Sequence, residues 1–169
     1  MATTTTSTPT ADRPRIPKEY GIPASTKGLL PWAHVDARLS AATVYWLATS
    51  GPGGVPRVRP LDGLWHDGVL YVGGSPETRW VRDLVDNPQV SVHLDDGSDV
   101  VILEGTAEVL AHGVERSVAE SLAAMAGAKY PQYGMTVESY TGPGPIAIRP
   151  QRGFGWTSFP KDVTRYSFG

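Results

Sequence analysis

Short segments of alternating or β-branched residues dominate the middle of the chain and predict β-strands. Residues 43–50 (TVYWLATS) are rich in β-branched and aromatic side chains, and residues 55–65 follow them across a glycine-rich turn at 51–54. Two such segments around a short turn predict a β-hairpin. A tight turn at 66–68 (HDG) leads to a third strand at 69–74, which extends the hairpin to a three-stranded meander.

The strand pattern continues in the C-terminal half. Val90, Val92 and Leu94 alternate with polar residues, as in a half-buried strand. Gly105 lies inside a long apolar segment, and a glycine within a strand indicates a bulge or a bend. The strands predicted beyond residue 88 cover residues 89–95, 100–110, 145–150, 152–159 and 162–168.

Three segments have the apolar period of a helix instead. They cover residues 29–41, residues 77–86, where Asn87-Pro88 ends the pattern, and residues 114–129. Their apolar stripes are Trp32, Val35 and Leu39 in the first, Trp80, Val81, Leu84 and Val85 in the second, and Val114, Val118, Leu122 and Met125 in the third. Residues 130–145 contain several glycines and prolines and are expected to form a loop.

Six to eight strands, mostly joined by hairpins and carrying three inserted helices, predict a mainly β protein folded as an antiparallel barrel. We expect one domain over residues 19–169. The arm at 1–18 begins with a Thr/Pro-rich stretch that has too little apolar surface to order itself, so it is expected to be disordered. The alternative is an arm that packs on a partner subunit.

Charge and composition exclude several classes of protein. Fifteen basic and 17 acidic residues give a net charge of −2, which argues against nucleic acid or an anionic membrane surface as a partner. No segment resembles a membrane span or a secretory signal, so a cytoplasmic location is expected. The sequence has no cysteine, which excludes disulfides and thiol nucleophiles. Its four histidines lack metal-ligand spacing, and no serine-hydrolase or nucleotide-loop motif is present.

Two arginines mark the strongest candidate for chemistry. Arg57 and Arg59 alternate on one predicted strand and therefore share a face of the sheet. Adjacent guanidiniums repel each other, and a phosphate or carboxylate ligand would satisfy both through bidentate hydrogen bonds. The alternative is a solvent-facing strand edge on which they pair with Asp62 or Glu104.

The helix predicted from residue 77 offers a second anion site. Its first backbone N–H groups are free and the Thr78 hydroxyl lies beside them, while Arg79 and Arg82 add charge one turn apart. An ordinary amphipathic helix with a solvated basic face is the alternative. Trp80 could stack on a ligand ring or fill the core, and the same two possibilities hold for Trp156, which follows Gly153 and Gly155.

The order of these motifs resembles the pyridoxamine 5'-phosphate oxidase-like family of FMN-binding split barrels, which includes flavin- and deazaflavin-dependent reductases. The resemblance rests on YWLATSGPGGVPRVRPLDGLWHDGVLYVGG, SPETRWVRDLVDNPQVSVHLDDG and VVILEGTAEV, followed by the tail PKDVTRYSF. It covers all of the chain except the arm and parts of two helices and one loop. It implies a split barrel and a homodimer with two cofactor sites at the subunit interface.

The resemblance also implies the cofactor and the residues that hold it. The cofactor is FMN or the deazaflavin coenzyme F-420, and both carry hydride. The positions that match the family's cofactor site are Arg57, Val58, Arg59, Thr78, Arg79, Trp80 and Trp156, the last reaching from the other subunit. Arg165 falls near a basic family position. Close relatives of the oxidase carry lysine at position 80, so the tryptophan here argues against vitamin B6 oxidation.

Together these features predict a cofactor-dependent oxidoreductase that transfers hydride to or from a small conjugated substrate. In such an enzyme the reactive atom belongs to the cofactor, so no protein nucleophile is needed. The helix at 114–129 and the loop at 130–145 are expected to line or cap the site, with Tyr130, Tyr133 and Tyr140 as contacts. The alternative is a non-catalytic carrier or sensor of flavin, haem or a pigment on the same barrel.

Overall fold

The computed structural model describes residues 8–169 and has one antiparallel sheet of nine strands. Seven strands follow one another in the order β1-β9-β8-β7-β6-β2-β3, and β4 joins the sheet through β5, which pairs with β8. The strands are β1 (Thr10–Asp12), β2 (Tyr45–Ser50), β3 (Pro56–Leu61), β4 (Gly63–His66), β5 (Val69–Gly73), β6 (Gln89–His93), β7 (Val100–Val109), β8 (Pro145–Trp156) and β9 (Thr164–Ser167).

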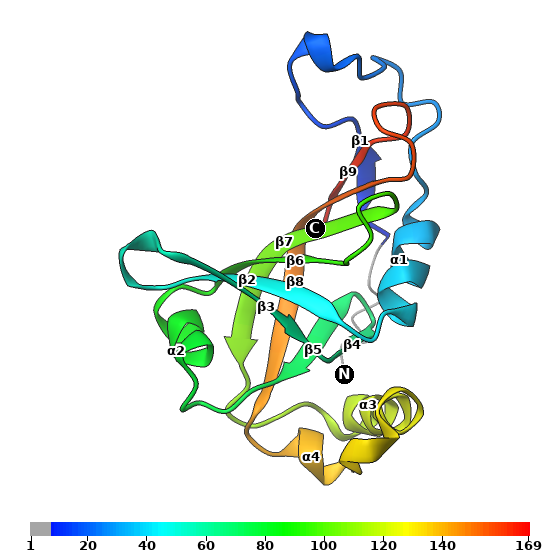
Figure 1. Ribbon diagram of the computed structural model, residues 1–169. Helices are drawn as coiled ribbons and strands as arrows, with labels where there is room; N and C mark the ends of the chain where they lie inside the picture. The colour runs from blue at the N-terminus through cyan, green and yellow to red at the C-terminus, as the bar shows by residue number, and fades with distance from the viewer. Residues whose placement is uncertain (1–7) are drawn as a thin grey trace.

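Four α-helices and three short 3-10 helices decorate this sheet (Figure 1). In Figure 1, α2 lies beside the β2–β3 hairpin, α1 lies on the other side of the barrel, and α3 and α4 lie together at one end. The helices are α1 (Trp32–Ala41), α2 (Arg79–Asp86), α3 (Arg116–Lys129), α4 (Glu138–Thr141), η1 (Lys18–Tyr20), η2 (Pro52–Gly54) and η3 (Pro131–Tyr133). The predicted mainly β antiparallel barrel with inserted helices is confirmed.

Strand β8 closes the barrel because it changes partners along its length. Residues 145–148 pair with β5, residues 152–155 pair with β9, and β7 pairs along the other side. The register between β7 and β8 shifts next to Gly105, where a Cβ would overlap the carbonyl oxygen of Arg149. Glycine therefore lets the two backbones approach closely at the predicted bulge.

Two boundaries differ from the predicted strands. The segment 55–65 breaks at Asp62 into β3, which pairs with β2, and β4, which pairs with β5. The predicted strands at 145–150 and 152–159 form the single strand β8 as far as Trp156, because β7 pairs with both parts across the bulge. Residues 157–159 lie in the turn that follows. The turn at 66–68 is confirmed, with Asp67 and Gly68 at φ values of 47° and 74° that suit a two-residue hairpin turn.

The arm at 1–18 is not disordered where the structure describes it. Residues 10–12 form β1 and pair with β9 of the same chain. Arg13 is buried, and its guanidinium donates to the carbonyl oxygens of Ser25, Lys27 and Val163 at 2.9–3.0 Å. These tertiary hydrogen bonds compensate for the low apolar content on which the prediction rested. Residues 1–7 lie outside the described residues.

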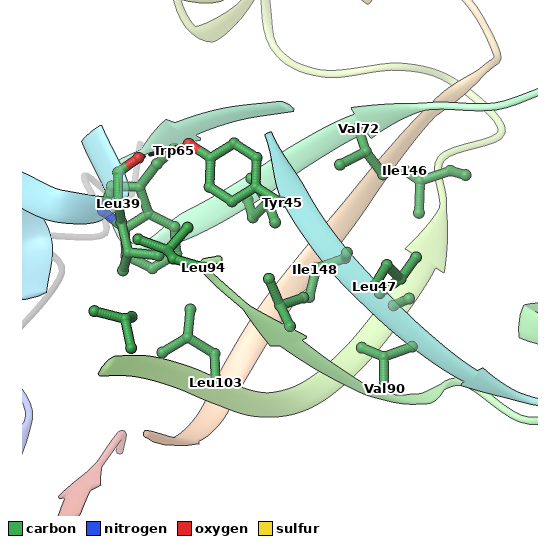
Figure 2. Close-up of a cluster of buried hydrophobic side chains, with 14 of the residues drawn as sticks. Leu39, Tyr45, Leu47, Trp65, Val72, Val90, Leu94, Leu103, Ile146 and Ile148 are labelled. Atoms are coloured by element: carbon green, nitrogen blue, oxygen red, sulfur yellow. Dashed lines mark hydrogen bonds between the residues drawn. The ribbon is translucent and has the colours of Figure 1, made fainter. Parts of the chain in front are cut away.

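The main core fills the barrel with the inward-facing residues of the strands and two residues of α1. Figure 2 shows aliphatic side chains from β2, β6, β7 and β8 converging around Tyr45. A second cluster forms on the other side of β4, where Leu64 packs against α3 and α4, while the adjacent Trp65 points into the main core. Strand β4 is therefore covered on both faces, and α3 is held against the barrel.

Two buried tyrosines tie the first helix region to the sheet. The Tyr45 hydroxyl donates to the Leu39 carbonyl at 2.5 Å (Figure 2), and the Tyr166 hydroxyl donates to the Leu30 carbonyl at 2.6 Å. Burial raises the pKa of both phenols far above the usual value. Unfolded tyrosines ionise near pH ~10, so above that pH the unfolded state loses protons that the folded state keeps. These groups therefore support stability fully below about pH 10 and less above it.

We expect Tyr45→Phe to lower the free energy of unfolding at pH 7 by about 1–3 kcal/mol, because the Leu39 carbonyl loses its donor. The fall in stability above about pH 10 should be shallower in this variant than in the wild type. Urea unfolding between neutral and alkaline pH measures both effects. The exposed Tyr20 provides the control, since Tyr20→Phe should not change stability at neutral pH. An unaltered alkaline slope in Tyr45→Phe contradicts this assignment.

Candidate functional site

Strand β3 presents Arg57, Arg59 and Leu61 to the interior and Pro56, Val58 and Pro60 to the outside. Arg57 and Arg59 are half-buried and alternate with Val58, whose exposed fraction is 56%. This follows from the two-residue period of a strand, and it places the Val58 side chain on the opposite face from both guanidiniums. Of this predicted set on β3, the structure therefore brings only the two arginines together on one face.

Arg57 is held by a carboxylate of helix α2. Its Nη1 donates to Oδ2 of Asp83 at 2.5 Å, and the side chains of Arg57 and Asp83 are 24% and 4% exposed. The alternative partners expected for a solvent-facing strand are engaged elsewhere. Asp62 accepts a hydrogen bond from the Tyr133 hydroxyl at 2.7 Å, and Glu104 lies 3.6 Å from Arg152. Arg57 is thus part of a buried ion pair between β3 and α2.

Arg59 lies beside this pair without a carboxylate of its own among residues 8–169. Its Nη1 donates to Oγ1 of Thr49 at 3.3 Å, and its guanidinium carbon lies 5.6 Å from the ring centroid of Trp80. Burial lowers the pKa of Arg59, and the negative charge of Asp83 opposes this shift. Arg59 is therefore a half-buried cation that has an aromatic neighbour and remaining donor capacity.

The start of α2 follows directly on a turn built from Ser75 to Thr78. The Thr78 hydroxyl donates to the Ser75 carbonyl at 2.7 Å and does not cap the helix. The first N–H groups of α2 therefore lack a side-chain acceptor, as an anion site at a helix N-terminus requires. Arg79 is exposed, while Trp80 is half-buried and packs against the main core.

Trp80 also connects the arginines with a neighbouring cavity. A Cβ at Gly74 would overlap the Trp80 ring, so the ring lies directly on the backbone of Gly74. Gly74 in turn lines a cavity of about 690 Å³ between the β3–β4 corner, the end of β5 and the helices α3 and α4. Pro60 and Leu61, which follow Arg59, line the same cavity. The cationic corner and the cavity are therefore adjacent.

The wall of this cavity is aromatic and nearly free of charge. Tyr130, Tyr133 and Tyr140 line it, as the sequence predicted for the helix and loop between β7 and β8. The Tyr130 hydroxyl accepts from the Gly63 amide at 3.1 Å and lies 2.7 Å from the Thr43 carbonyl. Burial raises the pKa of Tyr130 and Tyr140, and the hydrogen bond to Asp62 raises the pKa of Tyr133, so all three are neutral at pH 7. Asp62 is the one acidic residue in the lining.

The structure does not bring Trp156 to this corner within one chain. Trp156 ends β8 opposite Val100 and makes an edge contact with Phe159 at 5.8 Å, whereas Pro145 begins β8 and lines the cavity. Eleven residue steps along a strand correspond to roughly 35 Å. Arg165, on β9, lies 3.4 Å from Asp12 of β1. A role for Trp156 at the cofactor site therefore requires a second subunit and stays a prediction.

Asp83 is the site residue that sequence reasoning missed. The apolar stripe of α2 was expected to include Val85, but Val85 is 74% exposed and Asp83 takes a place on the buried face between Val81 and Leu84. Because aspartate is polar, the helical pattern of residues 77–86 predicted that Asp83 would face solvent. The sequence feature that points to Asp83 lies on strand β3. Two inward-facing arginines require a buried counter-charge.

These features define a small antiparallel barrel with a cationic corner beside an aromatic cavity. A family model described as pyridoxamine 5'-phosphate oxidase matches residues 32–152. The chain therefore belongs to the pyridoxamine 5'-phosphate oxidase family, which confirms the resemblance found in the sequence. None of the curated proteins matches the chain.

Solved structures share the fold at low sequence identity. A conserved hypothetical protein from Mycobacterium tuberculosis is 20% identical with a TM-score of 0.62, and the match covers 76% of this chain and 85% of that one. An F420 reductase is 18% identical with a TM-score of 0.54 over 70% and 94% of the two chains. A FAD-binding protein from Mesorhizobium loti is 20% identical with a TM-score of 0.57 over 83% and 96%.

No helix within residues 8–169 is both long enough and apolar enough to cross a membrane. In the same residues, histidine and acidic side chains do not gather in any group of three or more that could hold a metal ion.

The Arg57–Asp83 pair generates an expectation for stability. Arg57→Ala should lower the free energy of unfolding by about 3–5 kcal/mol, because it leaves the Asp83 carboxylate buried without a partner. The double variant Arg57→Leu/Asp83→Leu should recover most of that loss, since no charge then remains buried. Chemical denaturation of the three proteins measures the difference. If Arg57→Ala is as stable as the wild type, the ion pair between Arg57 and Asp83 does not hold α2 against β3.

Proposed function

We propose that this protein is an oxidoreductase that binds FMN or coenzyme F-420 and transfers hydride between that cofactor and a small conjugated organic molecule. The observation that carries the proposal is Arg59, a half-buried cation without a carboxylate partner in residues 8–169, directly before Pro60 and Leu61, which line a largely uncharged aromatic cavity. Flavin-type cofactors combine an anionic tail with a flat, mostly apolar ring, and this pair of features is complementary to both parts.

The residues present fit such a cofactor. Arg59, the first turn of α2 and the exposed Arg79 would hold the anionic tail through charge-assisted hydrogen bonds. The ring would lie along Pro60 and Leu61 and over Gly73, next to which a Cβ would meet nothing within 4 Å. A cavity of about 690 Å³ is within the range of cofactor sites. Solved structures of this fold include proteins named for F420 reduction and FAD binding, which supports the same class.

The division of labour follows from the residues of the site. The bound cofactor supplies the hydride chemistry. The chain binds and orients it, and the aromatic wall of Tyr130 and Tyr140 excludes water from the ring. Burial raises the pKa of Tyr130 and Tyr140, so these two phenols present uncharged rings to the cofactor at pH 7. A cysteine-free chain is compatible with the cytoplasm, which we propose as its location.

Binding and turnover test this function directly. Titration of the purified protein with FMN and with coenzyme F-420 should give a dissociation constant in the micromolar range or below for at least one of them. Arg59→Ala should weaken that binding by about 1.5–3 kcal/mol, because a charge-assisted hydrogen bond is lost. Arg15→Ala, an exposed arginine of the arm, is the control and should bind as the wild type does.

Two outcomes would contradict the proposal in different ways. Binding of neither cofactor removes the whole assignment. Tight binding without oxidation of the reduced cofactor by any conjugated acceptor, such as a quinone or a nitroaromatic compound, would identify the protein as a carrier or sensor instead.

We also propose that the protein is a homodimer, as its family resemblance implies. The outer face of the sheet carries a row of register partners that runs through Pro60, Trp46, His93, Ile102 and Phe154. The rings of Trp46 and His93 stack at 6.1 Å, and no residue of this row is buried in the single chain. Trp156 lies two residues beyond Phe154 on the same face. A continuous, largely apolar row of this kind suits a second copy of the chain.

The oligomeric state tests the proposed dimer. Light scattering after size-exclusion chromatography should give twice the mass of the chain at micromolar concentration. Ile102→Glu should convert the protein to a folded monomer, because a charge would be buried at the centre of the row. Ala124→Glu, on the exposed side of α3, should leave the dimer intact. A wild-type monomer would refute the dimer without affecting cofactor binding by a single chain.

A further inference from the structure

We propose that Asp83 sets the charge of the cofactor site, so that the site prefers a singly charged phosphate group to a doubly charged one. A phosphodiester, as in coenzyme F-420, carries one negative charge at the phosphate. A phosphomonoester, as in FMN, carries about −1.5 to −2 at pH 7. The inference rests on the proposed function and specifies which of its two cofactors the site is built for.

The first step is that the charge of Arg57 is already balanced by a carboxylate. Its guanidinium donates to Asp83, whose side chain is 4% exposed. A buried carboxylate that loses its partner is strongly destabilising, so a phosphate that competes for Arg57 must overcome that cost. The charges of Arg57 and Asp83 therefore cancel each other within the ion pair.

The second step is that the pair is built into the fold on both sides. Asp83 lies on α2 between Val81 and Leu84, which are both buried in the main core and prevent the carboxylate from moving to solvent. The Arg57 guanidinium lies against the backbone of Gly51, where a Cβ would overlap its Nη1. Gly51 is itself buried. Arg57 thus occupies a slot between the hairpin turn and α2 that only glycine leaves open.

The third step is the charge that remains. Arg57, Asp83 and Arg59 together carry +1, and of the two arginines only Arg59 has no carboxylate partner among residues 8–169. Trp80, at the start of α2, contacts Arg59 through its ring and adds no charge. The Arg79 side chain is exposed, so solvent screens its contribution. One half-buried cation balances one phosphate charge and leaves the second charge of a monoester without a partner.

Affinities for three probes test this inference in the full-length protein. Riboflavin has the ring without phosphate, FMN adds a monoester, and coenzyme F-420 carries a diester. In the wild type, FMN should bind less than about tenfold more tightly than riboflavin, because its second phosphate charge is unpaired. Coenzyme F-420 should bind more tightly than FMN. These wild-type measurements need no variant and can overturn the proposal by themselves.

Asp83→Asn keeps the shape of the side chain and releases the charge of Arg57. In this variant the advantage of FMN over riboflavin should grow by about tenfold or more, since the charge of Arg57 is no longer cancelled and can balance the second phosphate charge. Affinity for riboflavin should not change. Asp86→Asn removes the same charge from an exposed position of the same helix and should leave all three affinities unchanged. Circular dichroism verifies that each variant is folded.

The outcomes separate the inference from the function on which it rests. Two results would overturn the role of Asp83 alone. One is wild-type protein that binds FMN as tightly as coenzyme F-420. The other is a folded Asp83→Asn variant whose affinity for FMN rises no more than that of Asp86→Asn. Protein that binds none of the three probes overturns the proposed function, and the inference with it.

Discussion

The buried carboxylate of Asp83 is the constraint on which the arrangement of the site depends. It lies on the core-facing side of α2 and must be paired, so it holds Arg57 of the edge strand β3 against that helix. The same contact fixes the start of α2, and with it Trp80, beside Arg59. One ion pair thus decides which of the two strand arginines keeps an unbalanced charge. The ion pair first of all joins β3 to α2. As a consequence, the candidate site is left with a single net positive charge.

Strand β8 imposes a second constraint, because it belongs to both halves of the barrel. Its first residues pair with β5 and line the aromatic cavity, whereas its last residues pair with β9 and carry Trp156 to the far end. Trp156 and the candidate site therefore lie far apart within one chain. In the proposed dimer, the outward face of β8 would let Trp156 of one chain approach the cavity of the other.

Much of the fold was predictable because it depends on local periodicity. The alternation in β6, the turn at Asp67-Gly68 and the close approach at Gly105 each follow from a few neighbouring residues, and each occurs where expected. The arm differed because its order comes from Arg13, which bonds carbonyls of residues 25, 27 and 163. The sequence has no local signal for hydrogen bonds between segments so far apart. The same holds for the break at Asp62, where β3 and β4 part to follow different partners.

The candidate site divides in the same way. By itself, the sequence determined that Arg57 and Arg59 share a face and that a helix starts near residue 77, because side-chain period is a local property. It also predicted that Tyr130, Tyr133 and Tyr140 line a ligand site. Only the tertiary structure decided that Asp83 neutralises Arg57, that Trp80 lies under Arg59 and that the aromatic cavity opens beside both. Which charge is cancelled and which is left for a ligand depends on contacts between β3 and α2, and such contacts exist only once the chain has folded.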